Sequence, residues 1–145
     1  GHCIAVDPWF LASAKPELTK IIQKARLVND NKIEWVFNKI IRKVNELEIK
    51  KKRRINIGCF GISFKPNVDD LRCSPALKIV NKLIDHGYDV FVCEPNINKY
   101  EKFPLYEIDQ VVESCDILVY LVAHSSFYRI ESSNKEVLDI CGLNI

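Results

Sequence analysis

The sequence predicts an α/β protein in which a long N-terminal helical segment is followed by a doubly wound, Rossmann-like parallel sheet. Apolar residues recur every three or four positions across the first third of the 145-residue chain. Short, almost continuously apolar runs then alternate with helical patterns. Apolar strands that alternate with helices are typical of parallel sheets that are buried on both faces.

The helical pattern extends from about residue 15 to residue 52. Pro16 suits a first-turn position, and the segment Asn29–Asn31 could mark a break with a new N-cap, so one long helix and two consecutive helices both remain open. An apolar stripe of this length has more surface than one neighbouring domain covers, which favours a helix-mediated contact between subunits. We expect the basic run Lys50–Arg54 to be a solvated linker, with phosphate or nucleic-acid binding as the alternative.

The rest of the chain predicts strands separated by helices or loops. The helix Ala76–His86 has Ser74 and Pro75 at its start and Gly87 at its stop, and a short helix is expected at Glu107–Ser114. Parallel sheets of this kind bind ligands beyond the carboxyl ends of their strands. The site is therefore expected where residues 61–72, 94–98 and 123–127 follow strands. The expected strands are Ile55–Gly61, Tyr88–Cys93, Asp116–Val122 and Val137–Ile140.

Composition narrows the class of partner. The chain is 48% hydrophobic and 28% charged, which is the balance of a globular protein in water. No stretch approaches the roughly 18 uninterrupted apolar residues of a membrane span. A formal net charge of +2 gives no reason to expect nucleic acid. We therefore expect a cytoplasmic protein with neither a membrane nor a nucleic-acid partner.

The six cysteines do not predict a metal site, because none form a CxxC pair and no spacing suggests zinc. Several, such as Cys59 and Cys93, lie in strand-like runs where a thiol behaves as a small core hydrophobe. We expect them to be reduced.

The segment between the first strand and the following helix carries Lys65, Asp69, Asp70 and Arg72. A basic side chain beside a helix N-terminus favours a nucleotide diphosphate, because the free N–H groups, the dipole and the cation all attract negative charge. Alternatively, the two aspartates and the arginine form a network that only shapes the turn, and spacing leaves both interpretations open. The glycines do not form a G-x-G-x-x-G fingerprint.

Near the start, Cys3 lies beside His2 and four residues before Asp7, in an expected loop. A cysteine with polar neighbours can act as a nucleophile, although a single cysteine near a terminus more often has no such role. His124 follows the third strand, where a loop-capping role is favoured over that of a general base.

Two segments resemble motifs of the UDP-glucose/GDP-mannose dehydrogenase family of nucleotide-sugar 6-dehydrogenases. Gly1–Pro8 resembles the family's nucleophile loop, in which an Asp follows the Cys by four residues, and Gly61–Pro75 resembles its C-terminal-domain signature. The motifs occur in the family's order with the long helix between them, so the resemblance covers essentially the whole chain. Phe64–Arg72, together with Val92–Ile97, is most similar to the UDP-N-acetyl-D-mannosamine branch.

The resemblance implies the C-terminal part of an NAD-dependent enzyme that oxidises the C6 alcohol of a UDP-sugar to a carboxylate. By carry-over, Cys3 forms a thiohemiacetal and then a thioester, Asp7 handles the proton or water, and Phe64 and Lys65 bind the substrate. Arg72 would contact NAD, which is bound mainly by a domain that precedes Gly1.

The resemblance also implies a homodimer through the long helix. It divides the chain into residues 1–52, with the nucleophile loop and central dimerisation helix, and residues 53–145, the UDP-sugar-binding α/β domain. One departure is Cys73, where many relatives carry an acidic residue that could orient Arg72. Without the cofactor domain, the chain alone is expected to be inactive. The alternative is a non-catalytic nucleotide-binding or oligomerisation module.

Overall fold

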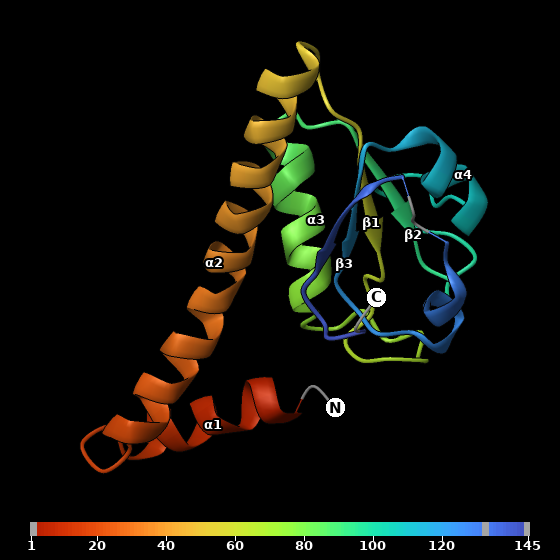
Figure 1. Cartoon of the computed structure of the whole chain (residues 1–145). Helices are drawn as coiled ribbons and strands as arrows, with labels where there is room; N and C mark the ends of the chain where they lie inside the picture. Colours follow the sequence, from red (N-terminus) through yellow and green to blue (C-terminus); the bar gives the residue numbers. More distant parts are fainter. Residues whose placement is uncertain (1–2, 132–133, 144–145) are drawn as a thin grey trace.

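The computed structural model describes residues 3–131 and 134–143 and confirms the predicted α/β class (Figure 1). Two helices come first and four strands then alternate with shorter helices. All strand pairs are parallel, and the strand order in the sheet is β2-β1-β3-β4. The elements are α1 (Cys3–Ala14), α2 (Lys20–Lys51), β1 (Ile57–Phe60), α3 (Pro75–Asp85), β2 (Val90–Cys93), α4 (Ile108–Ser114), β3 (Ile117–Tyr120), the 3-10 helix η1 (Ser125–Arg129) and β4 (Glu136–Asp139).

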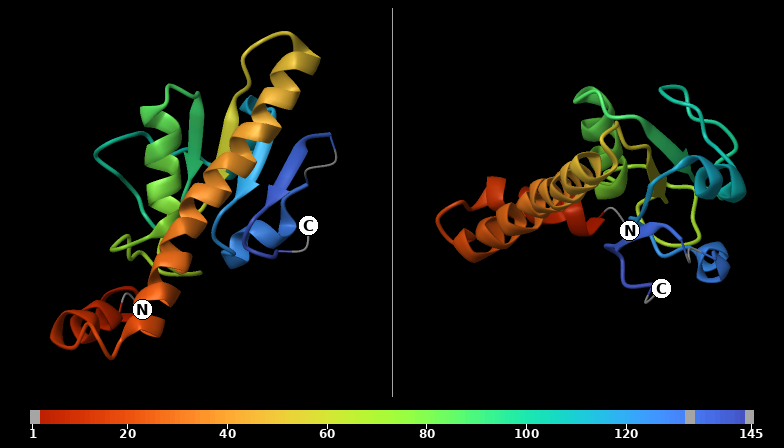
Figure 2. Two further views of the ribbon diagram at one scale, coloured as in Figure 1. Left: turned by 90° about the vertical axis from the view of Figure 1, so that its left-hand side faces the viewer. Right: turned by 45° about the horizontal axis from the view of Figure 1, so that its top comes forward.

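The central strands β1 and β3 are buried along their whole length, as their apolar sequences predict. Helices α2 and α3 lie side by side over one face of the sheet, and α4 lies on the other (Figures 1 and 2). Gly58 in β1 allows this close layering, because a Cβ there would lie 2.6 Å from Cγ1 of Val111 in α4. The sheet is therefore covered on both faces.

Helix α2 is continuous across Asn29–Asn31, which decides between the two alternatives left open there: the possible break does not occur. Asp30 instead accepts a 2.7 Å hydrogen bond from Nη2 of Arg26, one turn earlier, which stabilises the helix at this point. Helix α2 begins at Lys20 and not near residue 15, since Pro16 lies in the turn before it. Its second half packs on the domain through Val36, Phe37, Ile40, Val44 and Leu47.

The basic run at the end of α2 is not simply a solvated linker, which corrects that expectation. Nζ of Lys51 donates to Oδ1 of Asp116 at 2.6 Å, and the Arg53 guanidinium donates to both carboxylate oxygens at 2.5 and 2.9 Å. The backbone N–H of Asn56 donates to Oδ2 at 3.1 Å. Asp116 immediately precedes β3, so these contacts fasten the end of α2 to the amino edge of the sheet.

The first half of the helical segment leaves several large apolar side chains in solvent. They lie on α1, on the turn after it and on the first turns of α2, and no residue of the described chain covers them. The exposed residues are Ile4, Phe10, Leu11, Leu18, Ile21, Leu27 and Val28. Among residues 3–131 and 134–143, no helix is long and apolar enough to cross a membrane.

Candidate functional site

Strands β1, β2 and β3 end at the same level of the sheet. Phe60, the last residue of β1, pairs in register with Cys93 of β2 and with Tyr120 of β3. Gly61 turns the chain sharply with φ +86°, and a Cβ there would lie 2.5 Å from the Cβ of Val122. The segments that follow the three strands are thereby brought together, as the fold class predicts.

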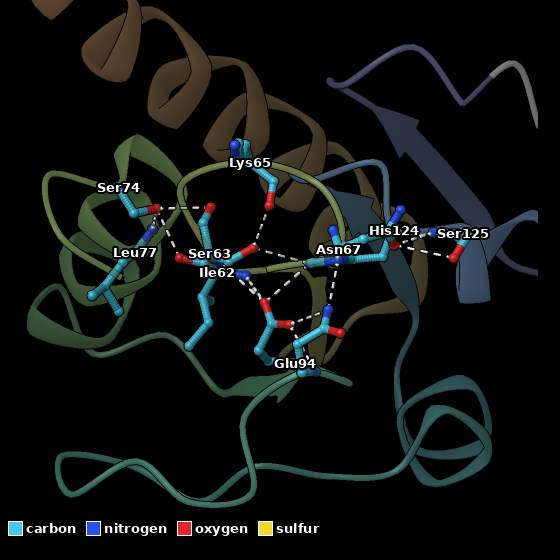
Figure 3. A network of polar contacts seen from close by, with 10 residues as sticks. Ile62, Ser63, Lys65, Asn67, Ser74, Leu77, Glu94, His124 and Ser125 are labelled. Carbon is cyan, nitrogen blue, oxygen red and sulfur yellow. Dashed lines mark hydrogen bonds and ion pairs between the residues drawn. The ribbon is translucent and has the colours of Figure 1, made fainter. Parts of the chain in front are cut away.

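Glu94 is the centre of the polar network at this edge (Figure 3). Its side chain is fully buried, and Oε2 accepts hydrogen bonds from the backbone N–H groups of Ile62 at 2.8 Å and Ser63 at 3.0 Å. Oε1 accepts from the backbone N–H of Asn96 at 3.1 Å. One carboxylate at the end of β2 therefore holds the start of the loop that follows β1, residues 61–72, which is called the β1 loop below.

His124 completes the network from the β3 end. Its Nδ1 accepts a 2.9 Å hydrogen bond from the backbone N–H of Asn67, which leaves the ring proton on Nε2. Nε2 lies 3.1 Å from Oε2 of Glu94 and 3.2 Å from Oγ of Ser63. Both ring nitrogens thus serve to hold the β1 loop, which agrees with the loop-holding role favoured by the sequence.

The network stabilises the ionised form of Glu94. Burial alone would raise the pKa of this carboxyl group, but the hydrogen bonds from His124 and from the N–H groups of Ile62 and Asn96 outweigh that effect and lower it. Backbone N–H groups donate to both oxygens of the carboxylate, so its charge is satisfied without an exposed cation.

Two further residues, Asn67 and Ser74, hold the later part of the β1 loop in place. Asn67, at φ +58°, accepts hydrogen bonds from both the backbone N–H and Oγ of Ser125 at 3.0 Å. Ser74 caps α3 by accepting from the N–H of Leu77 at 3.2 Å, and its Oγ donates to the Ile62 carbonyl at 2.7 Å. The backbone around Phe64 and Lys65 is therefore held at both ends.

The residues predicted to bind substrate and cofactor are accessible on this held loop. Lys65 is exposed, and Phe64 is partly buried. Arg72 forms a bidentate pair with Asp70, at 2.9 Å from Nε and 2.8 Å from Nη2, while 70% of its side chain stays exposed. Asp70 thus orients the guanidinium, which the acidic residue absent at Cys73 was expected to do.

The N-terminal segment faces this loop across a cavity of about 510 Å³. Ile4, Ala5 and Trp9 of α1 form one wall, and Phe64, Cys73 and the start of α3 lie opposite. Asp70 raises the pKa of Arg72 through its hydrogen bond and its charge.

Cys3 and Asp7 lie in helix α1 and not in a loop, which corrects the sequence prediction. Pro8 inside the helix removes the hydrogen bond that the Ile4 carbonyl would accept, and Nη1 of Arg26 donates to that carbonyl instead, at 3.4 Å. Both Cys3 and Asp7 are exposed. Their spacing places them one turn apart on the same face. Gly1 and His2 of the motif lie outside the described residues.

The sequence interpretation missed four side chains at this edge and around the cavity: Ser63, Asn67, Asn96 and Arg26. The first three were visible only as polar residues in segments that follow strands. Arg26 was one charge on a predicted helix. Across the described chain, no group of three or more His, Cys, Asp or Glu residues is placed to hold a metal ion.

Comparison with known proteins agrees with this arrangement. Residues 58–142 match the model of the UDP binding domain of the UDP-glucose/GDP-mannose dehydrogenase family. The chain is 40% identical to UDP-N-acetyl-D-mannosamine dehydrogenase of Escherichia coli strain K12 over 143 residues, which cover 92% of this chain and 34% of that protein. It is 36% identical to NDP-N-acetyl-D-galactosaminuronic acid dehydrogenase of Ralstonia solanacearum, covering 99% of this chain and 34% of that protein. The chain thus spans about a third of the length of these relatives.

Solved structures share the fold along nearly the whole chain. A UDP-N-acetyl-mannosamine dehydrogenase from S. aureus superposes with a TM-score of 0.76 at 26% identity, over 99% of this chain and 34% of that one. GDP-mannose dehydrogenase from Pseudomonas aeruginosa gives a TM-score of 0.75 at 22% identity, over 97% of this chain and 36% of that one. The second likeness concerns the fold alone.

Proposed function

Because the chain belongs to the UDP-glucose/GDP-mannose dehydrogenase family, we propose that it is the C-terminal third of an NAD-dependent dehydrogenase that oxidises the C6 alcohol of UDP-N-acetylmannosamine to the uronate. The observation that carries this proposal is the loop after β1, held by Glu94 and His124, which faces the first turns of α1 across a cavity. The 40% identity to UDP-N-acetyl-D-mannosamine dehydrogenase supports the choice of sugar. The division into residues 1–52 and 53–145 is part of the proposal.

Phe64 and Lys65 bind the UDP-sugar in this proposal. Lys65 is exposed on a loop whose backbone is fixed by Glu94 and Ser74, so its ammonium group can reach a diphosphate without a change in the loop. Phe64 lines the cavity and offers an apolar surface beside that position. The uridine diphosphate then lies at the carboxyl edge of the sheet, and the sugar points toward α1.

Cys3 is the nucleophile in this proposal. After C6 loses a hydride and its hydroxyl group loses a proton, which gives the aldehyde, the sulfur adds to the aldehyde carbon and the thiol proton passes to the carbonyl oxygen, which gives a thiohemiacetal. Loss of a second hydride and that proton gives a thioester, and water then releases the carboxylate and the thiol. Asp7, one helical turn away, accepts the proton of the thiol or of the attacking water.

NAD, bound mainly by the part of the protein that precedes Gly1, would supply the chemistry of accepting the two hydrides. Arg72 fits a contact to such a cofactor. Its guanidinium is oriented by Asp70 and is 70% exposed, so it can reach a phosphate held by another part of the protein. This chain's part is therefore to bind the nucleotide sugar and supply the nucleophile. We expect the enzyme to act in the cytoplasm.

A homodimer through the helical segment is also part of the proposal. Phe10, Leu11, Leu18, Ile21 and Val28 are each more than half exposed on the described chain. Such a concentration of apolar side chains is costly in water and suits an interface. Ultracentrifugation of the chain should give a dimer, and Ile21→Lys should shift it toward monomer.

The binding proposal is tested by titrating UDP into residues 1–145 by calorimetry. We expect binding, and Lys65→Ala should weaken it about tenfold, because one charge-assisted hydrogen bond is lost. Lys50→Ala, which changes an exposed lysine in the last turn of α2, should leave the affinity unchanged. Equal affinities of the Lys65→Ala and unmodified chains would remove Lys65 from the site.

The catalytic proposal is tested in the longer protein that carries this sequence. With UDP-N-acetylmannosamine and NAD, the Cys3→Ser variant should lose uronate formation by orders of magnitude, because an alkoxide nucleophile is far harder to generate than a thiolate. An unchanged rate would remove Cys3 from the mechanism. Absence of uronate formation in the unmodified longer protein would favour the alternative of a non-catalytic module that binds nucleotide or oligomerises.

A further inference from the structure

One imidazole ring, that of His124, holds the backbone on both sides of Pro66 in the β1 loop (Figure 3). On one side, the N–H of Asn67 donates to Nδ1 of the ring at 2.9 Å. On the other side, Oγ of Ser63 donates to the carbonyl of Lys65 at 2.9 Å and lies 3.2 Å from Nε2 of the ring. Because proline also fixes its own φ angle, the backbone of this segment has little freedom.

The hydroxyl group of Ser63 determines where the ring carries its proton. A hydroxyl group has one proton, and that of Ser63 goes to the Lys65 carbonyl, so its oxygen can only accept from Nε2. Nε2 therefore carries a proton, which it shares between this oxygen and Oε2 of Glu94 at 3.1 Å. The ring thereby connects the buried carboxylate to the backbone of Lys65.

The other ring nitrogen, Nδ1, cannot carry a proton without losing its contacts. It faces two donors, the backbone N–H of Asn67 and Nδ2 of Asn96, each at 2.9 Å. A backbone N–H group only donates. If the Asn96 amide turned over, its oxygen would approach Oε1 of Glu94, which now lies 3.4 Å from Nδ2. Only the neutral ring with its proton on Nε2 satisfies every contact.

A ligand at the carboxyl edge of the sheet cannot touch this ring. His124 is 0% exposed, and Phe127 packs edge-on against it with 5.2 Å between the ring centroids. The Lys65 side chain, by contrast, is exposed. Any effect of His124 on the affinity for a nucleotide therefore passes through the loop residues that the ring holds.

We propose that His124 is the positioning residue of the nucleotide site: in its Nε2–H tautomer it holds residues 65–67 in the conformation from which the Lys65 ammonium group meets the diphosphate. This inference rests on the proposed function, because it takes the diphosphate to lie at Lys65. A lysine side chain loses rotamer freedom when it binds a phosphate, and a loop that is already fixed adds no further ordering cost. Loss of the ring should therefore weaken nucleotide binding although no contact with the nucleotide is removed.

A double-mutant cycle with Lys65 tests this role. Calorimetry measures the affinity for UDP of residues 1–145 in the unmodified chain, in His124→Leu, in Lys65→Ala and in the double variant. We expect His124→Leu to weaken binding about tenfold when Lys65 is present, but less than about twofold when it is already alanine. A general loosening of the fold would weaken binding equally in both backgrounds. Ser63→Ala, a milder change that removes only the link to the Lys65 carbonyl, should show the same pattern with about a threefold loss.

His86→Leu is the matched control, because His86 is an exposed histidine at the end of α3 and its loss should leave the affinity for UDP unchanged. Circular dichroism shows whether each variant is folded at the temperature of the titration. If His124→Leu is not folded, Ser63→Ala takes its place in the cycle. NMR spectra of the isotope-labelled imidazole groups should show His124 protonated at Nε2 and not at Nδ1, with and without UDP.

Two results would overturn the role of His124 alone. One is a proton on Nδ1 in the imidazole spectra. The other is a chain that binds UDP but shows either no loss in the folded His124→Leu and Ser63→Ala variants or an equal loss in both Lys65 backgrounds. Failure of the unmodified chain to bind UDP would instead overturn the proposed function on which this inference rests.

Discussion

The two edges of the sheet each hold a buried carboxylate, but the groups that satisfy them are different. At the amino edge, Asp116 is 8% exposed and pairs with Lys51 and Arg53, whose side chains are 39% and 55% exposed. At the carboxyl edge, Glu94 is fully buried and its partners are the equally buried His124 and the backbone of the β1 loop.

The two networks therefore have different roles: the contacts of Asp116 join α2 to the sheet, whereas those of Glu94 support a candidate binding site. The cations of Asp116 can return to water if the carboxylate is lost, so the contact mainly joins α2 to the sheet. The partners of Glu94 cannot reach water, so they hold the loop in one conformation and leave Lys65 and Arg72 accessible on it. The edge with the more rigid network is the one where a ligand would benefit from a prepared loop.

The largest effect is expected for Glu94→Ala. This change leaves the buried N–H groups of Ile62 and Ser63 and the His124 ring without their acceptor, and we expect it to lower the free energy of unfolding by about 3–5 kcal/mol. Urea denaturation measures it. Glu101→Ala, at an exposed loop position, serves as the control. A loss below about 1 kcal/mol would show that the two edges do not differ.

A smaller effect is expected for Asp116→Asn. The amide keeps one oxygen acceptor, and the released Lys51 and Arg53 become solvated, so the free energy of unfolding should fall by only about 1–2 kcal/mol. The surface pair of Arg54 and Asp89, at 3.6 Å, provides the control variant Asp89→Asn, which should change stability little. A loss for Asp116→Asn that equals the loss for Glu94→Ala would remove the distinction between exposed and buried partners.

Acidification should destabilise both edges. Burial opposes ionisation of Asp116, but the hydrogen bonds from Arg53, Lys51 and the Asn56 backbone outweigh it and lower the pKa of its carboxyl group, and the pKa of Glu94 is lowered as well. A lowered pKa in the folded state stabilises the protein above the unfolded pKa of about 4 and loses that contribution as pH falls below it. Urea midpoints at about pH 6 and pH 3 measure the loss, which should be smaller in Asp116→Asn. An identical loss in that variant would exclude Asp116 as a source.

Most of the fold could be predicted because its signals are local. The strands β1 and β3 are continuously apolar, and α3 has Ser74 and Pro75 at its start and Gly87 after its end. Helix α1 could not be predicted, because Pro8 indicates a helix break. Pro8 leaves the carbonyl of Ile4 without its helical donor. Arg26, 22 positions further along the chain, donates a hydrogen bond to that carbonyl instead.

The site was predictable in position but not in its supporting contacts. The loop residues Lys65 and Arg72 follow β1, where this fold class places ligands. The hydrogen bonds that hold the loop join residues far apart in the sequence, such as Ser63 and His124, which are 61 positions apart. A single sequence contains no periodicity that reports such pairs, so Asn67, Asn96 and Arg26 acquired a role only in three dimensions.

In the proposed function the carboxyl edge of the sheet, and not the amino edge, binds the nucleotide. Titration of UDP into the isotope-labelled chain, followed by amide NMR spectra, tests it most directly. We expect the resonances of residues 62–72 and of Glu94 and Asn96 to shift, while those of Asn56 and Asp116 stay in place. Shifts centred on Asn56 and Asp116, or no shift at millimolar UDP, would contradict it.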